Sequence, residues 1–374
     1  MTLNSIHIVS FDIPVPVNYG GAIDIFYKLK ALQKKGIAIH LHCFQYGGRK
    51  PAHILNTICE RVYYYPRKSF SLNYYNKPYI VASRSNAQLI ERLLSDDSPI
   101  LFEGLHSCYY LSDKRLKNRK KIVRTHNIEH NYYQNLAIVE TNIAKKIYLK
   151  KEAAKLADFE KVLSFADGIA VISKNDYYYY FKKHTNVVHV SAFHQNKEVN
   201  IKPGKGNYAL YHGSLEVNEN NVAALYLINE VFNDIDKNLI IAGNNPLKQL
   251  ISAVEGKKNI KLISNVNVDD IQELVRNAHI NILPTFQTTG IKLKLLLSLY
   301  TGRHCLVNSP MVENSGLEDL CFIANNSIEF KRLLGEIFEK EFVIEEIDKR
   351  KKYLKERNFD NDSNADKLIK LIFG

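Results

Sequence analysis

The sequence predicts an α/β protein made of two doubly wound domains in tandem, and three observations support this. Short apolar runs typical of strands alternate with stretches of helical periodicity, a pattern that predicts parallel sheets covered on both faces. A polar stretch around Pro203, Gly204 and Gly206 interrupts the alternation, as expected of a linker. The 374 residues suffice for two complete cores. We therefore expect an N-terminal Rossmann-like domain at 1–195 and a C-terminal Rossmann-like domain at 206–355.

The N-terminal domain is expected to begin with a β-α-β unit. An apolar run at 6–11 ends in a Pro-rich turn, and Gly20 and Gly21 then open a stretch with apolar residues at helical spacing. A second strand follows at 37–44, which completes the unit. Further strands are expected at 62–65, 100–103, 122–125, 168–172 and 187–190. The longest helix is expected from about 142 to 165.

The C-terminal domain is expected to repeat the same alternation. Its strands are predicted at 208–212, 239–242, 260–263, 280–283 and 304–307. Its helices are predicted at 220–232, from about 247, at 268–277, 290–300 and 328–338. The tail at 356–374 is predicted to be helical. Its charge favours a place on the surface, and packing back on the N-terminal domain is the alternative.

Composition narrows the class of protein. No apolar run reaches the roughly 18 residues that a membrane helix needs. The first eleven residues lack a basic flank and predict a strand rather than a signal peptide. Five cysteines are scattered without a CxxC pair, which argues for reduced thiols and against disulfides or a zinc site. A cytoplasmic protein is expected.

Positive charge is concentrated in the first half of the chain. Residues 1–200 hold 29 Lys and Arg against 16 Asp and Glu, whereas residues 201–374 hold 22 against 23. A basic half is typical of proteins that bind nucleic acid, an anionic membrane surface or a phosphorylated substrate, and it also serves simply to keep a surface soluble. No nucleic-acid-binding motif accompanies the charge, so nucleic acid is not expected as a partner. The dense basic run at 114–121 could contact anionic lipid or an acceptor diphosphate, or be a solvated helix end.

Two loops of the N-terminal domain follow predicted strands, where ligands bind in open α/β sheets. Gly20 and Gly21 would let a backbone approach a ligand at a helix start, although glycines are also common there for steric reasons. The loop at 124–130 packs His126, Asn127, Glu129 and His130 together. His126 stands at the strand end, either as a cleft residue or in a surface hydrogen-bond network. His126 and His130 have a spacing that suits a metal on a helix, but the sequence offers no third ligand. No metal is therefore expected.

Two loops of the C-terminal domain suit a diphosphate. Gly213 and Ser214 could present N–H groups and a hydroxyl, while Asn218 or Asn220 could instead be a helix N-cap. Gly290, Lys292 and Lys294 meet at a predicted helix start. Because the helix dipole disfavours cations there, two lysines indicate a bound anion, unless one of them extends to solvent.

These loops, in this order, resemble those of the large retaining family of GT-B-fold glycosyltransferases that includes bacterial capsule and lipopolysaccharide enzymes. The resemblance covers almost the whole chain. It lies in four segments: FEGLHSCYYL at 102–111, RTHNIEHNYY at 124–133, YHGSLEVNENN at 211–221 and TGIKLKLLLSLYTGRHCLV at 289–307. It implies the GT-B architecture, in which two Rossmann-like domains face a cleft.

The resemblance also implies residue roles. His126 would lie near the transferred sugar, and Lys292 and Lys294 would flank the diphosphate. Donor-binding positions would be Gly20, Gly21, Gly213, Ser214, Asn218, Val266, Thr289 and Gly290. The donor would be a nucleotide sugar, the acceptor a saccharide or a lipid-linked saccharide, and no metal or other cofactor would be needed. Peripheral contact with an anionic membrane would suit such an acceptor.

One departure from the family pattern is expected to matter. Relatives often carry two glutamates eight positions apart, where this chain has Thr289 and Leu297. Leucine accepts no hydrogen bond, so the ribose of a donor would lose an anchor contributing about 1.5–3 kcal/mol. Hexose transfer with retention is the function we expect. A non-catalytic nucleotide-sugar-binding scaffold and a GT-B-fold nucleotide-sugar epimerase are the alternatives.

Overall fold

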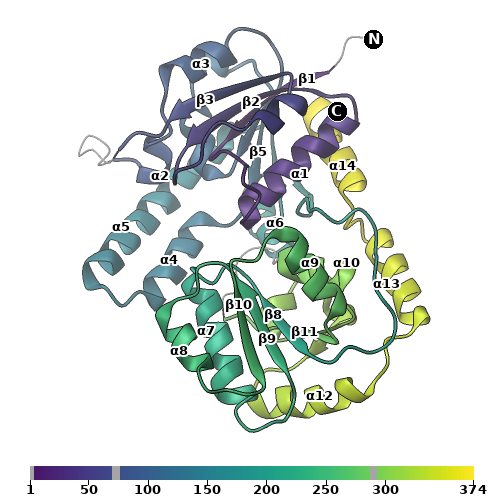
Figure 1. The fold of residues 1–374 in the computed structure, drawn as a ribbon. Coiled ribbons are helices and arrows are strands. Elements are labelled where there is room, and N and C mark those ends of the chain that lie inside the picture. Colours follow the sequence, from purple (N-terminus) through teal and green to yellow (C-terminus); the bar gives the residue numbers. More distant parts are fainter. Residues whose placement is uncertain (1–3, 70–75, 287–292) are drawn as a thin grey trace. The chain divides into compact units, whose positions relative to one another are not determined.

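A computed structural model of the chain describes residues 4–69, 76–286 and 293–374 (Figure 1). These residues form two compact units. The first contains the chain up to His194 together with Asn358–Gly374, and the second contains the described residues from Gln195 to Arg357.

The first unit is built on a seven-stranded sheet in the order β3-β2-β1-β4-β5-β6-β7, and every neighbouring pair is parallel. Its strands are β1 (Ser5–Ser10), β2 (Ala38–Gln45), β3 (Arg61–Pro66), β4 (Ile100–Glu103), β5 (Lys121–Thr125), β6 (Gly168–Val171) and β7 (Val187–His189). All seven predicted strands are present, and each boundary agrees with the prediction or differs from it by one residue. The carboxyl ends of β4 and β5 are adjacent because Glu103 lies opposite Arg124 in the register.

Helices cover both faces of this sheet. They are α1 (Gly20–Lys34), α2 (Tyr79–Ala82), α3 (Ala87–Leu93), α4 (Glu129–Val139), α5 (Ile143–Phe159), α6 (Lys174–Phe181) and α14 (Asn361–Phe373). The first core cluster joins α1 and α14 to one face of the sheet. The second joins α2, α3, α5 and α6 to the other. The helix predicted at 142–165 is α5 followed by a 3₁₀ turn at Glu160–Phe165.

The last helix, α14, belongs to the first unit although it comes at the end of the chain (Figure 1). Asp360 caps it by accepting from the N–H of Ser363 at 2.8 Å. Its apolar face enters the same core as α1, with Leu368 fully buried. The amide side chain of Asn364 accepts from the N–H of Ser191 at 3.0 Å, so the helix is also held by a buried hydrogen bond.

The second unit contains a six-stranded parallel sheet in the order β10-β9-β8-β11-β12-β13. Its strands are β8 (Ala209–His212), β9 (Leu239–Gly243), β10 (Ile260–Ser264), β11 (Ile280–Leu283), β12 (His304–Val307) and β13 (Phe322–Ile323). Five of them were predicted. The edge strand β13 was not, because two residues give no periodicity to detect.

The helices of the second unit are α7 (Asn218–Tyr226), α8 (Lys248–Val254), α9 (Val268–Asn277), α10 (Leu293–Thr301), α11 (Ser309–Val312), α12 (Ser327–Glu339) and α13 (Ile344–Glu356). The predicted helix at 220–232 is α7 continued by a π-helical turn, Leu227–Val231. Asn267 and Asp270 form a capping box at the start of α9. Residues of α9 and α10 pack on Leu210 and Ala242 of the sheet.

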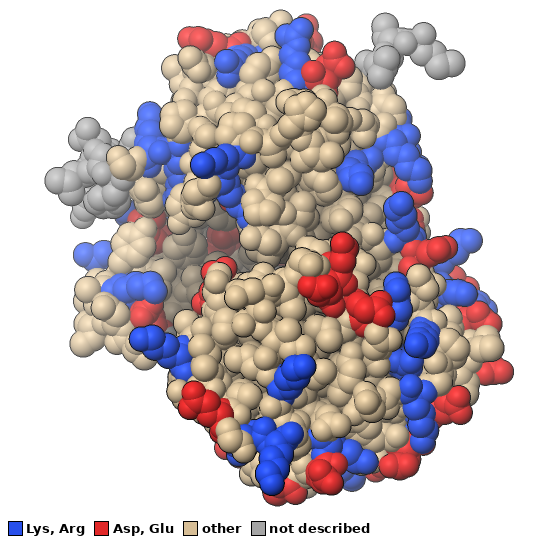
Figure 2. Space-filling model, in the orientation of Figure 1, with Lys and Arg blue, Asp and Glu red and all other residues tan. Residues whose placement is uncertain are grey.

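On the face in Figure 2, side chains of both signs are interspersed over the second unit. Among the described residues, none of the helices combines the length and the apolar character that crossing a bilayer requires. All five cysteines are free, and four of them are buried.

Candidate functional site

His126 stands at the carboxyl edge of the first sheet, one residue beyond β5. Its Nε2 atom lies 2.9 Å from Oε2 of Glu103, the last residue of β4. The ring packs edge-on against Phe11, with centroids 5.2 Å apart. The His126 side chain is about 10% exposed and Glu103 is fully buried. A buried carboxylate on Nε2 fixes the ring orientation and leaves Nδ1 as the second nitrogen for a ligand.

A buried network of charges supports this histidine. Lys28 of α1 lies between two carboxylates, 2.9 Å from Asp24 and 2.8 Å from Glu103. Arg124 holds Asp24 with two hydrogen bonds of 2.8 and 3.0 Å. Burial raises the pKa of Asp24, but the attraction of Arg124 and then of Lys28 is stronger and holds this pKa well below its usual range. Asp24 is therefore ionised at neutral pH, and the side chains of Lys28 and Arg124 are both placed against it.

The same network bears on metal binding. Ligand atoms of Asp24, Glu103 and His126 lie within 4.8 Å of one another. The Lys28 ammonium and the Arg124 guanidinium already neutralise both carboxylates, so an added cation would be repelled. His126 and His130, whose spacing suits a shared metal, turn to different partners. His126 contacts Glu103, and His130 lies 3.3 Å from Glu160.

A second polar pair lies close to His126: Glu129, which belongs to the loop noted in the sequence, and His106, which was not singled out from the sequence. His106 also packs against Phe11, with ring centroids 5.2 Å apart, and its Nδ1 lies 3.7 Å from Glu129. Burial, followed by the charge of Asp176, raises the pKa of Glu129 to about 8. Burial, followed by the guanidinium of Arg84, lowers the pKa of His106 well below its usual range. Glu129 is therefore a carboxylic acid and His106 a neutral imidazole near pH 7.

Gly20 and Gly21 open helix α1, as predicted. A Cβ atom on Gly21 would lie 2.8 Å from the Phe11 ring and 3.0 Å from the Tyr19 ring. Packing against these rings is thus sufficient reason for a glycine at position 21. A donor-binding role for this turn remains a prediction.

Gly213 and Ser214 form the turn between β8 and α7 in the second unit. Helix α7 begins at Asn218, and its N-cap position is Val217, so neither Asn218 nor Asn220 caps it as considered above. Asn220 instead closes the turn, because its amide donates to the Ser214 carbonyl at 2.9 Å. A Cβ atom on Gly213 would lie 3.2 Å from the same Asn220 side chain.

Lys294, in the first turn of the described part of α10, reaches this turn. Its Nζ donates to Asn220 Oδ1 at 3.0 Å and to the Tyr211 hydroxyl at 3.3 Å. Burial, followed by the positive charge of Lys294, lowers the pKa of His212 to about 3, so His212 is neutral. The structure thus brings Lys294, Gly213 and Ser214 to one edge of the second sheet, with Asn220 between them. Asn220 was considered from the sequence only as a cap.

The remaining predicted residues are placed as follows. Thr289, Gly290 and Lys292 lie outside the described residues. Val266 follows β10 and Asn265, whose φ of 59° is a left-handed conformation. Leu297 packs among the core residues of α9 and the sheet and is 8% exposed.

The basic run at 114–121 does not form one exposed patch. Arg119 is buried and donates to the carbonyl of Ser98 and to other carbonyls, and the Arg115 guanidinium pairs with Asp113 at 2.8 Å. Lys121 is also buried. Neither a lipid or acceptor contact nor a solvated helix end therefore describes Arg119 and Lys121. Lys121 is the first residue of β5, and Arg119 is held by backbone carbonyls.

Comparison with known proteins gives one family match and several structural matches. Residues 206–336 match the model of the family described as glycosyl transferases group 1. An uncharacterised 44.6 kDa protein in the cps region of Klebsiella pneumoniae is 28% identical over 346 residues, covering 87% of this chain and 88% of that protein.

Several solved structures resemble the whole chain, among them the following two. Staphylococcus aureus TarM, in a mutant crystallised with UDP, has a TM-score of 0.69 at 12% identity and covers 99% of this chain and 100% of its own. Sucrose-phosphate synthase of Thermosynechococcus elongatus has a TM-score of 0.70 at 11% identity and covers 98% of each chain. At such identities the likeness is one of fold, and the fold is GT-B.

Proposed function

From a glycosyl transferases group 1 domain in the second unit and the GT-B fold of the chain, we propose that this protein is a glycosyltransferase. It transfers a hexose from a nucleoside-diphosphate sugar to a saccharide or lipid-linked acceptor, with retention of configuration. The relative from a cps region supports a place in surface polysaccharide assembly. Transfer to a lipid-linked acceptor would take place at the inner face of a membrane.

The observation that carries the proposal is the turn after β8. Gly213 and Ser214 precede helix α7, and Lys294 approaches the same turn through Asn220. Backbone N–H groups at a glycine turn and a helix start favour an anion, and an ammonium adds a full positive charge. A diphosphate is the anion of a nucleotide sugar that fits this combination.

Catalysis would consist mainly of stabilising the leaving diphosphate. Its departure leaves an oxocarbenium-like sugar, and the charge that develops on the phosphate oxygens is balanced by Lys294 and the turn. The departing phosphate oxygen takes the acceptor proton, so no separate carboxylate base is needed. His126, held by Glu103 at 2.9 Å, orients the sugar or stabilises developing charge through Nδ1.

The first test is a thermal-shift screen against UDP-, GDP- and ADP-sugars and the bare nucleotides, without metal. A ligand at 100 times its Kd stabilises the folded state by about 2.7 kcal/mol, so one nucleotide class should raise Tm. Lys294→Gln should remove most of this rise and lower turnover. The matched control is Lys258→Gln, which removes an exposed lysine of the same unit. Equal shifts and equal turnover in the wild type and Lys294→Gln would contradict the role given to Lys294.

A specific observation favours a second candidate, a nucleotide-sugar-binding scaffold without turnover. Leu297, which stands where relatives carry a ribose-binding glutamate, packs in the hydrophobic core with Leu210 and Val275. Binding of a nucleotide sugar without transfer to any acceptor, and without hydrolysis, would favour the scaffold. Conversion of the donor sugar in the absence of acceptor would favour an epimerase.

A further inference from the structure

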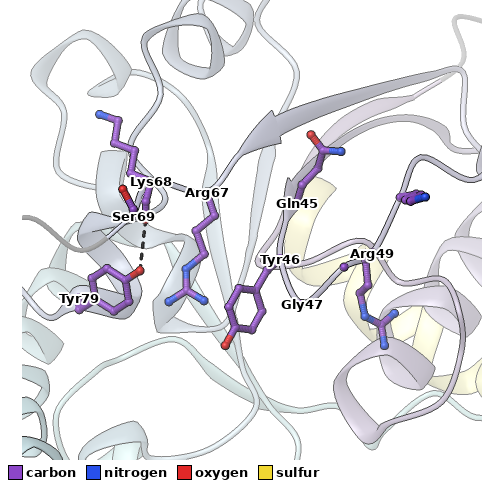
Figure 3. Close-up of a pocket in the computed structure, with 10 residues that line it drawn as sticks. Gln45, Tyr46, Gly47, Arg49, Arg67, Lys68, Ser69 and Tyr79 are labelled. Carbon is purple, nitrogen blue, oxygen red and sulfur yellow. Dashed lines mark hydrogen bonds between the residues drawn. The ribbon is translucent and has the colours of Figure 1, made fainter.

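The first unit contains a cavity of about 460 Å³ at the carboxyl ends of β2 and β3 (Figure 3). Three segments line it: the turn after β2, the turn after β3 and the start of α2. The lining residues are Gln45, Tyr46, Gly47, Gly48, Arg49, Lys50, Arg67, Lys68, Ser69 and Tyr79. Four of these ten residues are cationic and none is acidic. A volume of this size suits a small ligand such as a monosaccharide.

Arg49, in the turn after β2, connects the wall of the cavity to the segment that follows β1. Its Nε lies 3.2 Å from Asp12, and its guanidinium donates to the carbonyls of Ile13 and Pro16 at 2.9 and 2.7 Å. Its charge is thus balanced inside the protein. The lining cations other than Arg49 are Arg67, Lys50 and Lys68.

Arg67 is held in place for binding. Its Nε donates to the Ser83 hydroxyl at 2.8 Å, and its guanidinium lies 4.2 Å from the ring centroid of Tyr46 and 4.9 Å from that of Tyr79. Figure 3 shows the Arg67 side chain extended between these two rings. Anchoring through Nε leaves the two terminal nitrogens as a planar fork, the geometry that binds carboxylate or phosphate with two parallel hydrogen bonds.

Positive charge continues behind Arg67 towards His126. Arg84 is buried, and burial followed by the repulsion of Arg67 lowers its pKa to about 10. The Arg84 Nε donates to the Phe11 carbonyl at 2.7 Å, and the Phe11 ring packs on His126. An anion beside Arg67 would relieve the repulsion between the two guanidinium groups, so the region favours a negatively charged ligand.

We propose that this cavity binds an anionic sugar of the acceptor, through a carboxylate or phosphate on Arg67 and a sugar ring on Tyr46. Tyr46 is 56% exposed, so its ring has an open surface for the apolar face of a pyranose. The assignment to the acceptor rests on the proposed function. The binding of an acidic sugar does not, because the cavity lies wholly within the first unit.

The test is calorimetric titration of the full chain, without nucleotide, with glucuronic acid, glucose 1-phosphate, glucose and inorganic phosphate. Both acidic sugars should bind, and glucose and inorganic phosphate should bind at least tenfold more weakly. Arg67→Gln should raise the Kd of the acidic sugars about 10- to 100-fold, the range expected for hydrogen bonds to a charged group. Arg61→Gln removes an exposed arginine at the other end of β3 and should leave the Kd unchanged. Arg67→Lys, which keeps the charge but not the fork, should give an intermediate Kd.

The same titration distinguishes a carboxylate ligand from a phosphate ligand. A site for uronic acids should bind glucuronic acid more tightly, and a site for phosphosugars should bind glucose 1-phosphate more tightly. The proposal would be overturned if glucose bound as tightly as the acids, or if Arg67→Gln and Arg61→Gln had equal effects. It would also be overturned if inorganic phosphate matched glucose 1-phosphate. Nucleotide-induced thermal shifts of the same samples test the proposed function separately. Binding of the acidic sugars without a nucleotide-induced thermal shift would refute the proposed glycosyltransferase and support the anionic-sugar site. A nucleotide-induced thermal shift without binding of the acidic sugars would support the proposed function and refute the anionic-sugar site.

Discussion

Replacement of Glu129 by glutamine is expected to remove a pH dependence from the stability of the first unit. Glu129 begins α4 and is 2% exposed, and burial and the neighbouring Asp176 raise its pKa from 4.5 to about 8. Between these two values the folded state binds a proton that the unfolded state has lost. Stability is therefore full below pH 4.5 and falls as pH rises, until the folded carboxyl also ionises near pH 8.

The magnitude follows from the two pKa values. At about 1.36 kcal/mol for each pH unit, Glu129 should cost the wild type about 3.5 kcal/mol between pH 5 and pH 8. Glutamine resembles the protonated acid in shape and does not titrate. Asp176, whose pKa burial raises to about 6, is present in both proteins and contributes equally to them. The difference in stability between Glu129→Gln and the wild type should therefore grow in favour of the variant over this pH range.

Urea unfolding followed by far-UV circular dichroism at pH 5, 6, 7 and 8 measures this difference. Glu91→Gln, which removes an exposed carboxylate of α3, is the matched control and should run parallel to the wild type at every pH. If Glu129→Gln also ran parallel to the wild type from pH 5 to pH 8, Glu129 would be ionised in the folded protein. The assignment of a neutral carboxylic acid next to His106 would then be wrong.

Three further substitutions should destabilise the fold by separate mechanisms. Lys28→Met leaves Asp24 and Glu103 without the ammonium between them and should lower the free energy of unfolding in urea by about 3–5 kcal/mol. An unchanged urea midpoint would show that Lys28 does not stabilise the two buried carboxylates. Gly243→Ala would place a Cβ 1.9 Å from the Gly213 carbonyl oxygen and should lower the stability of the fold by about 2 kcal/mol or more, while weakening any nucleotide-induced thermal shift. An unchanged thermal shift would show that packing of Gly243 in β9 against the Gly213 turn does not affect nucleotide binding. Arg350→Met removes the donor to the carbonyls of Gly302 and Arg303 at 2.8 and 2.9 Å and should lower the stability of the second unit by about 2 kcal/mol, seen as faster amide exchange in β12; unaltered exchange there would refute this anchoring role.

Strands were the most predictable part of the fold. Runs such as Ile100–Glu103 and Ile280–Leu283 are apolar, short and bounded by turn residues, so their limits agree with the structure to the residue. Because the sheets are parallel, the position of His126 at a strand end also predicts its place at the ligand-binding edge. Its partner Glu103 could have been inferred from the same rule, since it ends the neighbouring strand.

The buried charges were not predictable from the sequence. Asp24 and Lys28 have the i, i+4 spacing of an ordinary surface pair. Their charges are balanced inside the fold by Arg124 of β5, which pairs with Asp24, and by Glu103 of β4, which pairs with Lys28. Likewise, the pKa of Glu129 is raised by burial and then by Asp176, which is distant along the chain. The Arg67 cavity joins three separate segments. Each of these features is produced by tertiary neighbours, whereas periodicity reports only on local structure.

The place of α14 has a consequence for the order of events during synthesis. The first unit begins with β1 and is finished only by the last helix, because Ala365 and Leu368 fill the same core as Ile25 and Leu29. The ribosome must therefore complete the entire second unit before the first can close its core. Until then, one face of the nascent sheet and of α1 stays open to solvent and to other chains. The described residues of the second unit lie between Gln195 and Arg357 and include no segment from either terminus, so this unit has no such delay. The half of the protein that is translated first is thus the half that finishes folding last.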